Sequence, residues 1–428
     1  MKVLKKVLKV LLIIVLVIVV LAAVLDAAWI FVPQIQASKK LADIKDYGHE
    51  GYQIEIPEGK TVIALGEASH GNVEFQELKL SVLKHLVETT GVRSFSLEAD
   101  YAEGIIVNEY IHGVGDIKDA REAVKMLTYG IYQTQQMVDL VQWMHDYNQG
   151  ADEADKLSFY GFDIRCPEID AKVIADYCDK NGITPNSGST ALLKEFAEKE
   201  SAIDDSKKDA FYADINGIRD NLDTSDAEAH SIAISCECVI KAKEHSELDP
   251  TDYIASSNER DKAMAENVSK IAALEKELGH DMIFITGHDG HVSTHPLFYT
   301  PMGINIKNEF ADGYYIIGTD YFKTTCNIVN SKGRGNYNFC SADPMAYQAK
   351  QFNGMYCIRF QDVLDGENKG ATYELIQKPM NAGSLGESYT PVMSFVPITN
   401  RVKNVMPEGY DAMIYVYKAT PTKILPRD

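Results

Sequence analysis

Residues 61–71 read TVIALGEASHG, an apolar run that ends in a glycine-flanked turn carrying Glu67 and His70. Three later apolar runs also lead into ionisable residues: FSL before Glu98, FYGF before Asp163, and MIFIT shortly before His288. Open α/β sheets bind ligands outside the carboxyl ends of their parallel strands. If the four runs are neighbouring parallel strands, these side chains converge on one crevice and supply the acid–base groups of a hydrolytic site.

The segments between these runs carry helical patterns. Apolar residues recur at helical spacing in three of them, 75–87, 101–112 and 133–149. The stretch 168–278 is rich in charged helical patterns and poor in strand signals, whereas 313–318 and 412–417 read as further strands. The sequence therefore predicts an α/β fold: a mainly parallel sheet flanked by helices, with a helical insertion or cap and an N-terminal transmembrane helix.

The amino terminus is basic and then apolar. Four lysines precede an uncharged apolar run from Val10 to Leu25, and Trp29 and Phe31 follow it. A secretory signal peptide has a shorter apolar centre and a small-residue cleavage site, for which residues 35–37 are only a weak candidate. The run is long enough to span a bilayer, its aromatic residues suit the interface, and its lysines predict a cytoplasmic amino end.

We therefore expect residues 1–35 to form a cytoplasmic basic tip and a transmembrane signal anchor, with a cleaved signal peptide as the alternative. Residues 36–428 are expected to form one hydrolase domain outside the cytoplasm, in which 168–278 is the helical cap. The protein is accordingly expected to be a single-pass protein of the cell membrane.

The composition limits the partners. The formal net charge is −20 over 428 residues, and such a body repels nucleic acid and anionic lipid, so no nucleic-acid partner is expected. The seven cysteines are scattered, the two in CEC at 236–238 are too close for an ordinary bridge, and the zinc-type CxxC pattern is absent. One or two disulfides are compatible with an exported domain, but nothing in the sequence requires them.

Two carboxylates and one histidine are the first candidates for catalysis. Glu67 and His70 lie three residues apart, and a carboxylate beside an imidazole fixes its tautomer and raises its basicity, as a general base requires. The alternative is a solvated loop histidine. Glu98 ends a buried run, where a carboxylate is costly unless it is paired or used. Its structural alternative is an ion pair with Arg93 or Lys79.

Two arginines are candidates for substrate contact. Asp163 and Arg165 form either a salt bridge that braces the sheet edge or a pair of substrate contacts. Arg260 opens a helical pattern, and it either directs a permanent positive charge into the crevice or forms a surface ion pair. Both arginines therefore have a structural and a functional interpretation.

His288 and His291 form a His-x-x-His pattern, with His295 four residues further on. This spacing allows metal ligation, with the carboxylates at the other strand ends as further ligands. Yet the histidines follow a strand in a glycine-rich turn, and the helical His-Glu-x-x-His pattern is absent. We therefore expect them to stabilise an oxyanion or protonate a leaving group, and we expect no metal and no cofactor.

Two motifs that are absent narrow the chemistry further. The chain has no G-x-S-x-G nucleophile elbow, which disfavours a serine mechanism. It also has no phosphate loop and no G-x-G-x-x-G after a strand, so a nucleotide cofactor is not indicated.

The ordered motifs resemble those of the erythromycin esterase family. The likeness is carried by LGEASHG at 65–71, EFQELK at 74–79, LEAD at 97–100, GFD at 161–163, RDKAMAEN at 260–267 and HDGHV at 288–292. It covers about 60–320, with a looser likeness to the end, and the anchor lies outside it. Lys79 stands where some members carry arginine, and Asp289-Gly290 replaces the pair often found between the two histidines.

The resemblance implies a hydrolase that opens a macrolide lactone without a covalent serine intermediate and without an obligatory metal. By the family's pattern, His70 is the general base that activates water, Glu67 and Glu98 orient and polarise it, and His288 assists at the carbonyl or leaving oxygen. The remaining candidates are assigned to substrate binding: Lys79, Asp163, Arg165, Arg260 and His291.

The expected function is hydrolysis of a small-molecule ester or lactone by general-base attack of water, with macrolide resistance as one consequence. One alternative is a metal-dependent hydrolase that uses His70, Glu98, His288 and His291. Another is a non-catalytic envelope protein that binds a small molecule or a tetrapyrrole in the same crevice. The sequence does not predict the oligomeric state.

Overall fold

The computed structural model of the chain describes residues 2–199 and 204–426. Its main sheet contains nine strands: β1 His49–Glu50, β2 Val62–Glu67, β3 Ser94–Asp100, β4 Ser158–Asp163, β5 Ile283–His288, β6 Tyr314–Asn330, β7 Gly333–Cys340, β8 Met355–Arg359 and β11 Ala412–Ala419. Their order is β1-β8-β11-β6-β2-β5-β3-β4, with β7 beside β6. The strands from β11 to β4 are parallel, and β1, β8 and β7 pair in the antiparallel sense. A separate ladder joins β9 Met380–Gly383 to β10 Arg401–Asn404.

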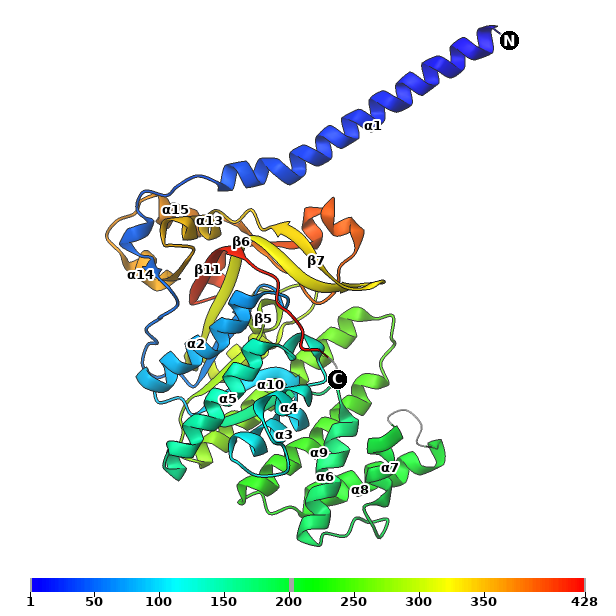
Figure 1. Cartoon of the computed structure of the whole chain (residues 1–428), viewed down its shortest axis with the longest axis vertical. Helices are drawn as coiled ribbons and strands as arrows, with labels where there is room; N and C mark the ends of the chain where they lie inside the picture. The colour runs from blue at the N-terminus through cyan, green and yellow to red at the C-terminus, as the bar shows by residue number, and fades with distance from the viewer. Residues whose placement is uncertain (1, 200–203, 427–428) are drawn as a thin grey trace.

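The helices have the following bounds: α1 Lys2–Ala37, α2 Val73–Thr89, α3 Tyr101–Ile111, α4 Ala120–Lys125, α5 Gln135–Gly150, α6 Pro167–Asn181, α7 Ala191–Lys199, α8 Asp205–Asn221, α9 Ala227–Ser246, α10 Tyr253–Glu277, α11 Asp289–Val292, α12 Met302–Phe310, α13 Pro344–Gln348, α14 Phe360–Asp365 and α15 Ala371–Ile376. Together with the sheet they confirm the predicted α/β class, in which helices flank a mainly parallel sheet (Figure 1).

The four apolar runs become β2, β3, β4 and β5, and β2, β5, β3 and β4 are consecutive neighbours in the sheet. Every residue of these strands is buried, as expected for parallel strands covered on both faces. Alternate residues of β2 face opposite layers: Ile63 and Leu65 pack with α2 and α5, whereas Val62 and Ala64 pack with α10 and α12. The fold therefore brings the carboxyl ends of all four strands to one edge.

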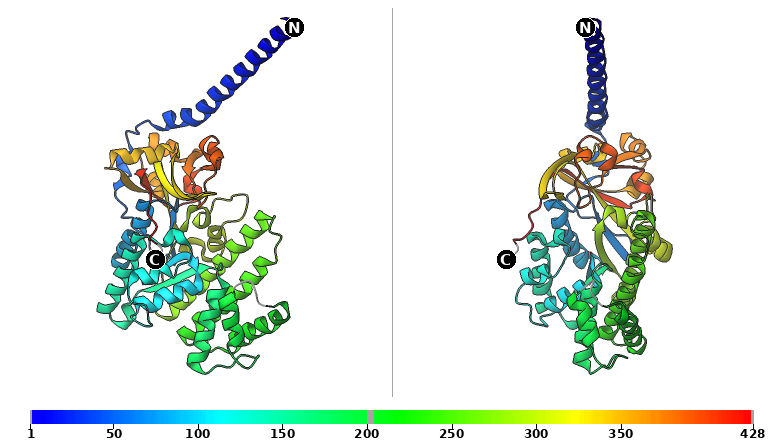
Figure 2. Two further views of the ribbon diagram at one scale, coloured as in Figure 1. Left: turned by 45° about the vertical axis from the view of Figure 1, so that its right-hand side comes forward. Right: turned by 90° about the vertical axis from the view of Figure 1, so that its right-hand side faces the viewer.

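The segment between β4 and β5 consists of five helices, α6 to α10. Side chains of α6 to α9 form an apolar cluster of their own, and α10 returns the chain to the sheet by packing on β4. Figure 2 shows this segment, in green, at the end of the body opposite α1. The use of 168–278 as a cap over a bound substrate stays a prediction.

Strand β6 is much longer than the predicted segment 313–318. Its first part pairs with β2 and β11, and its second part pairs with β7 in a hairpin that satisfies its backbone beyond the end of β2. The predicted strand at 412–417 is β11.

Helix α1 projects from the body as one long helix (Figures 1 and 2). An 18-residue window within its segment Leu4–Ala37 has a mean hydropathy of 3.4, so the helix is long and apolar enough to cross a membrane, a test that a signal sequence also passes. All seven cysteines are free thiols.

Candidate active site

The turn after β2 and the first turns of α2 build one half of the site. His70 Nδ1 lies 2.7 Å from Glu67 Oε1, and Lys79 Nζ donates to Glu67 Oε2 at 2.5 Å. Gln76 donates to the same oxygen at 3.3 Å and accepts from Lys79 at 3.2 Å. Gln76 and Lys79 reach one carboxylate because positions three apart on a helix share a face. All four side chains are buried.

These contacts determine which ring nitrogen of His70 carries the proton in the neutral form. Burial alone raises the pKa of Glu67, but the Lys79 ammonium and the His70 hydrogen bond outweigh it and lower that pKa to about 2. Glu67 is therefore an ionised acceptor, and His70 Nδ1 must donate to it. Nε2 is left as the basic nitrogen of His70, which is the state that a general base requires.

The other half of the site is centred on Glu98, next to a bulge between Leu97 and Asp100 in the pairing of β3 with β4. Glu98 Oε2 accepts the backbone N–H of His288 at 2.8 Å, and Oε1 accepts from Arg260 Nη2 at 3.1 Å. Bulges near functional sites redirect a side chain. The Glu98 carboxylate is thereby fixed between β5 and α10.

Arg260 forms a two-pronged pair with Asp163, from Nε at 3.0 Å and from Nη2 at 2.6 Å. It therefore joins two buried carboxylates, Asp163 and Glu98, that come from neighbouring strands. Burial raises the pKa of Glu98, but the charges of His291, His70 and Arg260 lower it overall. One guanidinium thus bridges the two buried carboxylates.

His291 lies beside the same guanidinium. Its Nδ1 contacts Asp261 Oδ1 at 2.8 Å, and its Nε2 lies 3.4 Å from Glu98 Oε1. Burial lowers the pKa of His291, but Glu98 and Asp261 raise it overall. Both ring nitrogens are already engaged, so this histidine completes the charge network around Glu98.

The structure overturns three sequence-based ion pairs. Asp163 pairs with Arg260 and not with Arg165. Arg93 pairs with Asp155, and Lys79 pairs with Glu67, so neither is the partner of Glu98. The pair that forms with Glu98 instead joins α10 to β3, elements that lie far apart in the sequence.

Arg165 is exposed and lies on the edge of the site. Its guanidinium carbon is 4.8 Å from the centroid of the Tyr129 ring, a cation–π arrangement. The Tyr129 ring is in turn 5.9 Å from the ring of His70. A cavity of about 130 Å³ lies here, lined by Glu98, Tyr129, Asp163 and Arg165 among others.

His288 completes the crevice at the end of β5. Its Nδ1 accepts the backbone N–H of Gly290 at 3.1 Å, so in the neutral ring the proton is on Nε2. Nε2 is buried and has no partner among the described residues. Burial and the neighbouring His70 and His291 lower the pKa of His288 to about 3, so the ring is neutral at physiological pH. Its Nε2–H is an unused donor, and the centroid of its ring lies 5.0 Å from that of His70.

The sequence reasoning did not single out four residues that shape the site: Gln76, Tyr129, Tyr132 and Asp261. Asp261 follows Arg260 directly, and that adjacency was a usable signal. Tyr132 packs edge-on against His70 at 6.4 Å, and its ring faces the Lys79 ammonium at 5.6 Å. The sequence around Tyr129 and Tyr132 has no pattern from which their contacts with His70 could be predicted.

Metal ligation is not favoured by the side-chain placement. Among residues 2–199 and 204–426, no three His, Cys, Asp or Glu side chains are grouped so that they could hold a metal ion. His295 is buried apart from the crevice, against Gly409 and Tyr410. The Asp289 carboxylate packs against Gly66 of β2, so closely that a Cβ on Gly66 would lie 1.9 Å from its Oδ1.

The sequence profile of the erythromycin esterase family matches residues 87–419 of this chain. An erythromycin esterase type II from Escherichia coli is 24% identical over 294 residues, which cover 60% of this chain and 68% of that protein. The region matched by the profile includes Glu98, Asp163, Arg260 and His288, whereas it begins after Glu67, His70 and Lys79 and excludes α1.

Three solved structures share the fold. A succinoglycan biosynthesis protein superimposes with a TM-score of 0.71 at 17% identity, covering 92% of this chain and 99% of that one. A Bacillus cereus protein gives 0.70 at 20% identity with the same coverage. A mutant of the erythromycin esterase EreC in its open conformation gives 0.56 at 14% identity, covering 86% of this chain and 93% of that one. Identities this low show similarity of fold alone.

Proposed function

The chain belongs to the erythromycin esterase family, which supports an ester hydrolase function, and we propose that it hydrolyses a small-molecule ester or lactone by general-base activation of water. The observation that carries the mechanism is the pair His70 and His288. Their ring centroids are 5.0 Å apart, and one ring presents a free base while the other presents a free N–H donor. Water and a carbonyl oxygen are the two groups that such a pair binds.

In the proposed reaction, His70 Nε2 removes a proton from water as the water oxygen attacks the carbonyl carbon. The negative charge that develops on the carbonyl oxygen accepts a hydrogen bond from His288 Nε2–H. Glu67 stabilises the imidazolium formed on His70. That imidazolium then protonates the leaving alkoxide, which yields the acid and the alcohol and restores the base.

Arg260 and Lys79 support this reaction at a distance from the reacting atoms. Lys79 keeps Glu67 ionised, and Arg260 fixes Glu98, which in turn holds the His288 backbone through its N–H. Arg165 and Tyr129 lie beside the 130 Å³ cavity and are proposed to contact the substrate. Neither His70 nor His288 lines this cavity, and its volume is below the roughly 300–1,000 Å³ typical of sites for drug-sized ligands, so we assign it to a substituent of the substrate and not to the ester group.

We further propose that α1 is retained as a membrane anchor with its amino end in the cytoplasm, so that the crevice lies outside the cytoplasm. The support is the length and hydropathy of Leu4–Ala37 together with the four lysines before the apolar run. Cleavage of the protein by an external protease in intact cells, with a protected amino-terminal fragment, tests this orientation.

Hydrolysis is tested with the full chain on a macrolide lactone and a panel of small esters, with product mass as the readout. We expect turnover by the natural protein and by His49→Ala, an exposed histidine outside the crevice, and a loss of about 10²–10⁴-fold in His70→Ala. A parallel assay with chelator separates this mechanism from a metal-dependent one. Turnover that survives in His70→Ala would overturn the general-base assignment.

A further inference from the structure

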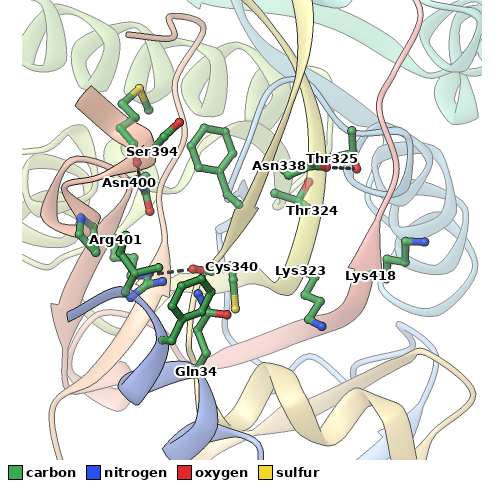
Figure 3. A pocket seen from close by; sticks show the side chains of 15 residues that line it. Gln34, Lys323, Thr324, Thr325, Asn338, Cys340, Ser394, Asn400, Arg401 and Lys418 are labelled. Carbon is green, nitrogen blue, oxygen red and sulfur yellow. Dashed lines mark hydrogen bonds between the residues drawn. The ribbon is translucent and has the colours of Figure 1, made fainter. Parts of the chain in front are cut away.

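A second cavity, of about 430 Å³, lies where α1 meets the body. It is lined by Ile30, Phe31 and Gln34 of α1 and by residues of β6, β7, β10, β11 and the segment 393–400. Figure 3 shows Gln34 at its edge with Lys323, Cys340 and Arg401 around it. None of its lining residues belongs to the candidate active site.

This cavity is cationic in an acidic protein. Lys323, Arg401 and Lys418 line it, and none of them forms an ion pair with a described residue. No Asp or Glu is among the described residues that line it. Three cations without a carboxylate partner at one place form a local positive charge on a chain whose net charge is −20.

Arg401 is held in a fixed orientation. Its Nε donates to the Cys340 carbonyl at 2.8 Å, and its two Nη groups have no partner among the described residues. A guanidinium with a planar free edge is suited to two oxygens of a phosphate. The cavity therefore offers a planar guanidinium at Arg401 and a point charge at Lys323, on either side of Cys340 (Figure 3).

The same end of the body also exposes apolar side chains. Val392, Phe395 and Ile398 have exposed fractions of 49%, 59% and 74% on the short 3₁₀ helices η6 Pro391–Ser394 and η7 Pro397–Thr399. In Figures 1 and 2 this orange segment lies on the side of the body from which α1 departs. An exposed apolar patch and a cationic cavity at the end of the body that carries an apolar helix suit contact with a bilayer surface.

We propose that this cavity binds the phosphate headgroup of an anionic glycerophospholipid, with Arg401 and Lys323 on the phosphate and the acyl chains along Ile30 and Phe31 of α1. The occupant is a lipid and not free phosphate because the anion-binding groups lie next to the apolar face of the anchor. The acidic net charge repels anionic lipid from the body as a whole. At this one end, however, the fold brings Lys323, Arg401 and Lys418 together into a local positive charge. The inference rests on the retained anchor proposed above.

The test uses the full chain, stripped of lipid in detergent and titrated with phosphatidylglycerol, phosphatidylcholine or glycerol phosphate, with bound molecules counted by native mass spectrometry. The variants are Arg401→Gln with Lys323→Gln, Lys418→Gln alone, and Lys332→Gln as a matched exposed lysine in the β6–β7 turn. A lysine or arginine near an anionic surface contributes about a fivefold effect on binding. We therefore expect phosphatidylglycerol binding to be at least about tenfold weaker in the double variant and about fivefold weaker in Lys418→Gln. Binding by Lys332→Gln should equal that of the natural chain.

Three outcomes would overturn the proposal. They are equal binding of the two lipids, unchanged binding in variants with an unchanged melting temperature, and binding of glycerol phosphate as tight as that of the lipid. The intact mass from the same spectra reports whether α1 is retained, and its loss would also overturn the lipid site. Ester turnover is measured separately, so failure here leaves the hydrolase assignment to its own test.

Discussion

His70 and His288 face each other across the crevice with ring centroids 5.0 Å apart, and their hydrogen bonds give them opposite protonation patterns. Glu67 accepts a hydrogen bond from Nδ1–H of His70, so in the neutral ring Nε2 is the basic nitrogen. The Gly290 N–H occupies Nδ1 of His288, which leaves Nε2 as a donor. The partner of Nδ1, a carboxylate for His70 and a backbone N–H for His288, thus makes Nε2 a proton acceptor in one ring and a hydrogen-bond donor in the other.

Replacing His288 tests the donor. Because one hydrogen bond to a developing oxyanion contributes about 10²–10³-fold to kcat, we expect a loss of that size in His288→Asn with little change in KM. Glutamine places an amide N–H close to the position of Nε2, so His288→Gln should recover part of the rate. Steady-state kinetics on one ester substrate provide both numbers. Equal loss in the two variants would contradict a donor role.

Lys79→Met tests the buried ion pair with Glu67. Lys79 is the largest favourable influence on the low pKa of Glu67, so its removal should raise that pKa and lower the free energy of unfolding by about 3–5 kcal/mol. The carboxylate pKa is depressed in the folded state, so the contribution of Glu67 is present above pH 4.5 and is lost as the pH falls towards 2. Urea unfolding across this range measures both effects.

The matched double variant Lys79→Met with Glu67→Gln removes both charges. It should be more stable than Lys79→Met alone, because no uncompensated carboxylate is left buried. If both variants unfold at the same urea concentration, the ion pair is not what stabilises this turn.

Local sequence patterns were sufficient for one part of the architecture. The runs that end at Glu67, Glu98, Asp163 and His288 are short, apolar and followed by ionisable residues, and parallel strands with buried faces produce that pattern. Their predicted convergence at one edge is what the structure contains. The contact between Glu67 and His70 was predictable because only three residues separate them.

Contacts between distant segments were not predictable in the same way. Asp163 and Arg260 are 97 positions apart, so the nearby Arg165 was the more obvious partner in sequence and was the wrong one. The second half of β6 was missed because its pairing with β7, and not its own apolar pattern, maintains the strand. Contacts with distant parts of the chain determine both the Asp163–Arg260 ion pair and the length of β6. Local sequence patterns do not reveal such contacts.

Gly66→Ala tests how closely β2 approaches the segment after β5. A Cβ at this position would lie 1.9 Å from Asp289 Oδ1 and 2.9 Å from Val292 Cγ2, both within a buried layer. We expect a loss of about 1–3 kcal/mol in the free energy of unfolding, because the added methyl group must displace packed neighbours. Gly130→Ala is the control, since no atom lies within 4 Å of its added Cβ. Similar melting temperatures for the two variants would show that the layers are less tightly packed than described.

Asp100 and Asp170 are neighbouring buried carboxyl groups that take no part in the proposed reaction, although Asp100 also lines the 130 Å³ cavity. Asp170 is fully buried beside Ser235 and the carboxyl group of Asp100, while Asp100 also accepts the N–H groups of Ala102 and Cys166. Burial raises the pKa of both groups, that of Asp170 to about 8. The folded protein therefore holds a proton here that the unfolded chain releases near pH 4.

Asp170→Asn should remove a pH dependence of stability. The folded-state pKa is raised above the unfolded value of 3.8, so the folded state binds more protons and its stability falls as the pH rises from about 4 to about 8. An asparagine has no proton to lose, so between pH 5 and pH 8 the natural chain should lose roughly 2–4 kcal/mol more than the variant. Asp176→Asn, an exposed carboxylate on the same helix, should leave the natural pH profile unchanged. Urea unfolding at several pH values measures the slopes, and parallel profiles for Asp170→Asn and the natural chain would mean that this carboxyl group is ionised throughout.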